Sequence, residues 1–118
     1  MSLFTQFTGN VVDKDNTSLK AYRYKGYHKE SDTWSKWYSS NNETQYNFNL
    51  GDADWLTQTG VANKNDTIII VAETLESNIV DRAYSFIVVK LTDDTTYIND
   101  IKLIKGTQPL VIDHWVLS

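Results

Sequence analysis

The feature that most constrains the fold of this chain is a series of short segments in which apolar and polar residues alternate. About seven or eight such segments follow one another at spacings of roughly 8 to 15 residues, separated by polar or glycine-containing turns. No stretch has the apolar spacing of a helix longer than one or two turns. This pattern is typical of an all-β protein, either an antiparallel sandwich or a barrel.

The expected strands cover most of the sequence, at about residues 4–12, 19–27, 46–50, 67–72, 82–91, 97–104 and 110–117. Residues 31–37 are the least regular part, and residues 39–43 and 73–80 are expected to be connections. Pro109 is compatible with the first position of the last strand. The segments at 19–27 and 46–50 each have a polar and an apolar face. Two stacked sheets require such faces, so we favour the sandwich over the barrel.

The stretch at residues 45–60, QYNFNLGDADWLTQTG, is expected to close one end of the core. Its alternation places three apolar side chains on one side of a strand, because strand side chains repeat with period two. Gly51 and Asp52 then end the strand, and a single helical turn would return a tryptophan to the core. Asp52 is expected to cap that turn, although Asp52 and Asp54 could instead bind an ion. The predicted core residues are Tyr46, Phe48, Leu50 and Trp55.

Composition limits the possible functions. A chain of 118 residues with 41% hydrophobic content fits one domain, residues 1–118. It has no cysteine, hence no disulfide or thiolate metal site. The net charge of -4 and the scattered basic residues argue against a nucleic-acid partner. The longest apolar run, residues 68–72, is too short for membrane insertion. No signal peptide is evident, and residues 1–3 are expected to be a cloning scar.

Several motifs resemble the transthyretin-like or carboxypeptidase-regulatory-like sandwich. They are a Gly-x-Val-x-Asp first strand at residues 9–13, a small residue at Ala21, a Tyr-x-Phe-x-Leu strand at 46–50, and an Asn-Asp turn into a β-branched strand at 65–70. The resemblance spans residues 7–91 and implies a single Ig-like or prealbumin-like antiparallel sandwich with Greek-key connections. Modules of this kind occur in phage structural proteins and in prokaryotic surface proteins. The hydroxyisourate hydrolases share the broader fold, but their C-terminal Tyr-Arg-Gly-Ser motif is missing here.

Catalytic and metal-binding motifs are weak. His28 and His114 are the two histidines, and Asp113 points to the opposite face of its strand from His114, so the two cannot form a dyad. We interpret both histidines as structural. Residues 13–18 begin like a calcium loop but lack the glycine and glutamate that such a loop requires. We therefore predict no enzymatic activity, no catalytic residue, no bound metal and no cofactor.

The aromatic residues Trp34, Trp37 and Tyr38 lie within five positions of one another in a polar segment. Exposed aromatic rings could bind sugar rings or anchor a protein partner. The alternative, which we favour, is that the two tryptophans pack on the core from a connecting turn, because a short chain needs large residues to fill its core.

The absence of recognisable chemistry favours a non-enzymatic structural or interaction module of a larger assembly, a phage virion or a cell-surface protein. Its partners would be other proteins or neighbouring copies of itself. The alternative is a carbohydrate-binding module that uses Trp34, Trp37 and Tyr38 to bind a glycan. The favoured location is a virion or the extracellular or cell surface.

Overall fold

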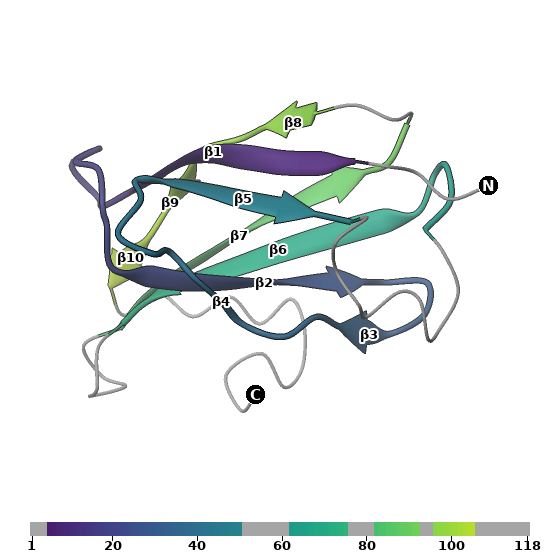
Figure 1. Cartoon of the computed structure of the whole chain (residues 1–118), viewed down its shortest axis with the longest axis horizontal. Coiled ribbons are helices and arrows are strands. Elements are labelled where there is room, and N and C mark those ends of the chain that lie inside the picture. Colours follow the sequence, from purple (N-terminus) through teal and green to yellow (C-terminus); the bar gives the residue numbers. More distant parts are fainter. Residues whose placement is uncertain (1–4, 51–61, 76–81, 93–95, 106–118) are drawn as a thin grey trace.

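Two β-sheets form the described part of the chain, residues 5–50, 62–75, 82–92 and 96–105 of a computed structural model (Figure 1). In the first sheet, β1 (Gln6–Val12) lies between β5 (Gln45–Asn49) and β8 (Thr96–Ile98) and also pairs with β9 (Ile101–Lys102). The second sheet has the order β10 (Ile104–Lys105), β7 (Ala83–Lys90), β6 (Thr67–Thr74), β2 (Tyr22–His28) and β3 (Thr33–Trp34), and β4 (Tyr38–Ser39) also pairs with β2. The fold is the all-β sandwich that the alternation predicted.

The described residues form ten strands, more than the seven or eight expected. The irregular segment at 31–37 contains β3, and β4 follows it at the start of the expected connection; both have two residues. The strand expected at residues 97–104 is divided into β8, β9 and β10. The sheets are also not wholly antiparallel, because β1 pairs in parallel with β8 and β9. Alternation reports which face of a strand is buried and is the same for both strand directions, so it could not reveal this.

The segment from β8 to β10 joins the two sheets. β8 and β9 pair with β1, whereas β10 pairs with β7 in the second sheet. Between β8 and β9, the carbonyl of Asn99 accepts a hydrogen bond of 2.8 Å from the Tyr46 hydroxyl, and Asp100 accepts one of 2.9 Å from the amide of Asn10. Gly9 permits this approach, since a Cβ there would lie 2.0 Å from the Asn99 oxygen.

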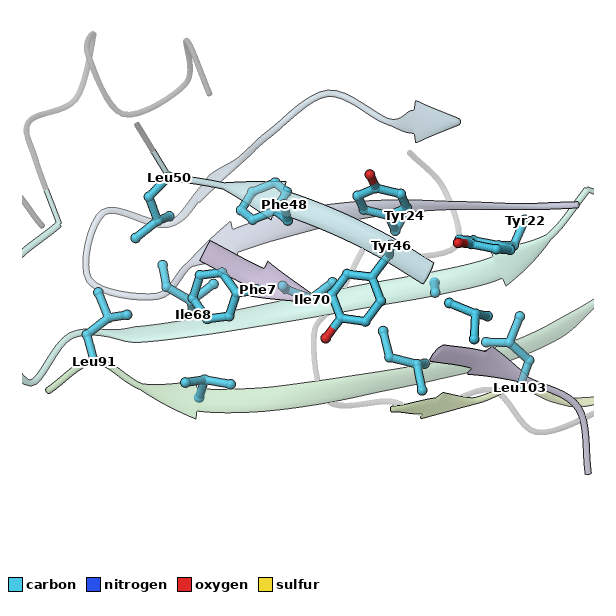
Figure 2. Close-up of a cluster of buried hydrophobic side chains, with 14 of the residues drawn as sticks. Phe7, Tyr22, Tyr24, Tyr46, Phe48, Leu50, Ile68, Ile70, Leu91 and Leu103 are labelled. Carbon is cyan, nitrogen blue, oxygen red and sulfur yellow. The ribbon is translucent and has the colours of Figure 1, made fainter. Parts of the chain in front are cut away.

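The core lies between the sheets and is built from both of them (Figure 2). Tyr46, Phe48 and Leu50 are buried in it, with exposed fractions of 1%, 1% and 4%. The second sheet contributes Tyr22 and Tyr24 from β2 and a continuous apolar run from β6. Burial on both faces of β6 agrees with its central position in the sheet. The buried members of this core are Phe7, Val11, Tyr22, Tyr24, Tyr46, Phe48, Leu50, Ala62, Ile68, Ile70, Ala72, Val89, Leu91, Ile101 and Leu103.

The middle of the outer edge of β5 is hydrogen-bonded within the molecule. The Tyr24 hydroxyl donates to the carbonyl of Asn47 at 3.0 Å and accepts from the amide of the same residue at 3.4 Å. By the register with β1, the backbone groups of Asn47 are among those of β5 that point away from β1. An edge strand whose backbone groups are already bonded is a poor template for another strand.

Two predictions from the sequence lie outside the described residues. They are the corner with Asp52 and Trp55, and the last strand at 110–117 with His114. Within the part that is described, no helix has the length and apolar character needed to cross a membrane.

Candidate functional site

The outer face of the second sheet, which points away from the main core, carries two buried charged residues, Lys25 and Glu73, beside a second apolar cluster. The strand register aligns Arg23 with Glu73 and Lys25 with Val71, and Glu73 in turn with Tyr84. Period-two alternation places these residues on the face of β2, β6 and β7 that points away from the main core. A second apolar cluster covers this face, formed by Ile69, Val71 and Tyr84 with Tyr27, Trp34, Trp37 and Phe86 packed against them.

Lys25 lies between two tryptophan rings. Its Nζ is 4.2 Å from the ring centroid of Trp34 and 4.6 Å from that of Trp37, and the residue is only 2% exposed. Both distances are within the range of a cation–π interaction. Burial and, secondarily, the charge of Arg23 lower the pKa of Lys25 to about 8, while the carboxylate of Glu73 opposes the shift. The alternation predicted the outward direction of Lys25 correctly, but not its burial.

Glu73 connects two arginines beside this lysine. Its Oε1 accepts hydrogen bonds from Arg23 at 2.7 and 3.0 Å, and its Oε2 accepts one from Arg82 at 3.3 Å. The Glu73 side chain is 4% exposed, whereas those of Arg23 and Arg82 are 29% and 23% exposed. The Arg23 guanidinium also lies 4.0 Å from the Trp37 ring centroid. One buried carboxylate therefore serves two guanidiniums, one from β2 and one from the residue before β7.

The three aromatic residues that were candidates for one binding platform are divided between the two faces of the sheet. Trp34 and Trp37 pack on the outer cluster. Tyr38 packs on the main core, stacked on Tyr24 at 5.8 Å and edge-on to Phe48 at 5.7 Å between centroids. Trp37 directly precedes Tyr38, the first residue of β4, and neighbouring residues of an extended chain point to opposite faces. A single flat sugar platform built from all three rings is not favoured by this geometry.

A second polar cluster lies where β2 ends and β6 begins. The imidazole of His28 is 5% exposed, and its Nε2 lies 2.8 Å from Oδ2 of Asp66 and 3.7 Å from Oε1 of Glu30. Its other nitrogen, Nδ1, lies 2.6 Å from Oγ of Ser31. Both ring nitrogens thus have partners, as expected of a structural histidine, but the partners include the carboxylates that the sequence did not place beside it.

The segment that begins like a calcium loop is a tight turn. Oδ1 of Asp13 accepts hydrogen bonds from the amides of Asp15 and Thr17 at 2.8 and 2.9 Å, and Asn16 has a positive φ of 64°. These interactions are typical of an aspartate that caps its own turn. Near this turn is an open polar cleft of about 340 Å³, lined by Asn10, Val12, Asn16, Ser18, Asp100 and Lys102.

Sequence reasoning did not single out Glu73 or Asp66. Glu73 had one usable signal, because it follows Ile69 and Val71 at period two and therefore shares their face. Its pairing with Arg23, 50 positions away in the chain, depends on β2 and β6 being neighbours in the sheet. Asp66 belongs to an Asn-rich turn that gives no sign of contact with His28.

Two solved structures share this fold at low sequence identity. The crystal structure of the shaft pilin SpaA from Lactobacillus rhamnosus GG aligns with a TM-score of 0.53 and 12% identity over 92% of this chain and 50% of the pilin chain. A double mutant of the same pilin aligns with a TM-score of 0.53 and 13% identity, over 90% and 48% of the two chains. This chain therefore spans about half the length of those pilin chains, and at such identity the likeness shows the fold alone.

No family model and no curated protein matches the sequence. The structural likeness agrees with the sandwich that the transthyretin-like resemblance implied. It does not point to that family specifically.

Proposed function

We propose that this chain is a non-enzymatic structural module of a surface assembly, on a cell or a phage virion, and that it acts through contact with neighbouring protein chains. The observation that carries the proposal is the sandwich fold shared with a shaft pilin, whose name makes it a component of a pilus. In support, the charged residues of the outer face contact one another and the tryptophan rings, which gives them a structural role.

We propose β8 as the contact strand. Among the described strands it lies at the end of the first sheet and pairs only with β1. Ile98 is 74% exposed, the most exposed of the large apolar side chains described. The opposite edge, β5, has the backbone groups of Asn47 bonded to Tyr24, so it is a poorer template. A partner strand beside β8 would gain backbone hydrogen bonds and cover the Ile98 side chain.

The test is the mass of the purified chain in solution as a function of concentration, measured by sedimentation velocity or light scattering. We expect concentration-dependent association, and we expect Ile98→Asp to weaken it at least tenfold, because a charge would be placed in the contact. Val88→Asp is the matched control, since Val88 is 54% exposed and belongs to β7 of the second sheet, whereas β8 belongs to the first.

If the chain is monomeric at all concentrations and also fails to bind the products of neighbouring genes, the proposal is wrong. Equal loss of association in both variants would place the contact elsewhere and would contradict the role of β8.

A further inference from the structure

The cluster at the junction of β2 and β6 combines one imidazole with two carboxylates. The potential ligand atoms of His28, Glu30 and Asp66 all lie within 4.8 Å of one another. A tetrahedral zinc ion, with bonds of about 2.0 to 2.2 Å, holds its ligand atoms about 3.4 Å apart. The observed distances of 2.8 Å and 3.7 Å from Nε2 of His28 to the two carboxylates are on either side of this value. Small side-chain movements would therefore make the cluster a three-ligand site.

Each of the three side chains is also held by a second hydrogen bond. Ser31 contacts Nδ1 of His28 at 2.6 Å, the amide of Asn63 donates to Oδ2 of Asp66 at 2.8 Å, and the amide of Thr67 donates to Oε1 of Glu30 at 2.9 Å. Outer interactions of this kind orient the ligands of metal sites. The three side chains are thus held in position by groups outside the set of potential ligands.

We propose that His28, Glu30 and Asp66 bind a divalent transition-metal ion of the zinc class, with solvent in the remaining position. An imidazole with two carboxylates suits zinc, cobalt or manganese better than calcium, which prefers a shell of oxygen ligands alone. The 41% exposure of the Glu30 side chain gives the ion a route from solvent and gives this ligand freedom to adjust.

Metal binding requires only that the proton of the His28 ring move from one ring nitrogen to the other. In the metal-free protein, the short distance to Asp66 fits an Nε2–H that donates to this carboxylate, with Nδ1 accepting from the Ser31 hydroxyl. To bind the ion, the ring carries its proton on Nδ1 instead, and the Ser31 hydroxyl rotates to accept it. The Nε2 lone pair is then available to the metal, and both carboxylates bind as anions.

The experiment uses Co²⁺ as a spectroscopic probe and Zn²⁺ as its competitor, with the full chain. We expect one Co²⁺ per chain to give a saturable visible absorption band that Zn²⁺ abolishes, and Zn²⁺ to shift the ring nitrogen resonances of His28 in NMR spectra. Glu30→Gln is expected to weaken binding at least tenfold. Glu30 is the variant of choice because its side chain is 41% exposed, whereas those of His28 and Asp66 are 5% and 15% exposed, so we expect it to disturb folding least.

Two further variants serve as controls. Glu43→Gln removes one exposed carboxylate elsewhere and is expected to leave the affinity unchanged. His114→Gln removes the second histidine in the sequence, and its binding should equal that of the parent chain. Absence of a saturable band, or binding that is lost in His114→Gln but kept in Glu30→Gln, would overturn the proposal and leave the cluster as a hydrogen-bonded link between β2 and the turn before β6.

Discussion

Gly26 of β2 lies against the ring of Phe48 of β5, so closely that a Cβ on Gly26 would be 2.5 Å from Cζ of Phe48. This contact joins the two sheets at the centre of the core. The glycine supplies the space that the phenylalanine ring occupies, and a real Cβ atom essentially never approaches another atom so closely. The distance between the sheets at this point therefore depends on both residues together.

Gly26→Ala should lower the free energy of unfolding by about 1 to 3 kcal/mol, because an added methyl group overfills a packed core. Urea denaturation of the parent and variant chains measures the effect. A double-mutant cycle with Phe48→Leu tests the cause, since the smaller side chain should recover part of the loss and give a coupling energy of at least about 0.5 kcal/mol. Strictly additive losses would show that the Phe48 ring does not limit the space at position 26.

Glu73→Gln should lower the free energy of unfolding by about 2 to 3 kcal/mol at pH 7. The substitution preserves the shape of the side chain but removes the buried charge shared by Arg23 and Arg82, which leaves two guanidiniums close together. We expect less than the roughly 3 to 5 kcal/mol typical of a broken buried pair, because both arginines keep some access to water. Glu43→Gln, at an exposed carboxylate, is the control and should change stability by less than about 0.5 kcal/mol. Equal effects of the two substitutions would argue against a structural role for the arginine pair.

Lys25→Met should raise the free energy of unfolding at pH 7 by about 1 kcal/mol, because it replaces a buried charge with an apolar side chain of similar length. The gain should shrink between pH 8 and pH 10. The pKa of Lys25 is about 8 in the folded chain and 10.5 in the reference state, so the folded parent binds fewer protons in this interval. Its stability must then rise with pH relative to the variant.

Denaturation of both chains at pH 7 and pH 10 checks this dependence. If the difference in unfolding free energy between the two chains does not change with pH, the pKa of Lys25 is not lowered by its burial between the tryptophans.

The buried tyrosines should make the fold sensitive to alkali. Burial, followed by the charges of Tyr24 and Glu43, raises the pKa of Tyr22 to about 12, and burial also raises the pKa of Tyr46. The folded chain therefore keeps these protons while the unfolded chain loses them near pH 10. The contribution of these tyrosines to the free energy of unfolding is fully present below pH 10 and is lost as the pH rises toward 12.

Absorbance at 295 nm follows the ionisation directly, and urea denaturation follows the stability. We expect Tyr22→Phe to reduce the slope of stability against pH above pH 10, at a constant cost of about 1 kcal/mol from the lost bond to the Glu43 carbonyl. An unchanged slope would show that Tyr22 ionises as easily in the folded chain as in the unfolded one.

The sequence was informative where one face of a strand is apolar. The alternation in β2 separated Tyr22 and Tyr24 from Arg23 and Lys25, and the structure places these pairs on opposite faces of the sheet. The pattern around Tyr46 and Phe48 likewise lies in the main core. These inferences succeed because the period of the side chains is a local property of an extended backbone.

The sequence did not show which segments contact one another in the folded chain. The closeness of Trp34, Trp37 and Tyr38 in the chain suggested a common platform, but the backbone direction between them sends Tyr38 to the core and the tryptophans to Lys25. No property of residues 34–38 alone reveals that a lysine from β2 lies beneath the two rings. Strand pairing supplies this information, and it depends on residues far apart in the chain.

The sequence by itself determined an all-β chain with alternating faces and a core containing Tyr46, Phe48 and Leu50, because period and apolarity act within each segment. Only the tertiary structure decided the pairing of Arg23 with Glu73, the parallel neighbours of β1, and the meeting of His28 with Asp66. The physical reason is that burial depends on side-chain type. The neighbours of a strand depend on how the connections pass between the two sheets. The sequences of short polar loops do not predict which strands they bring together.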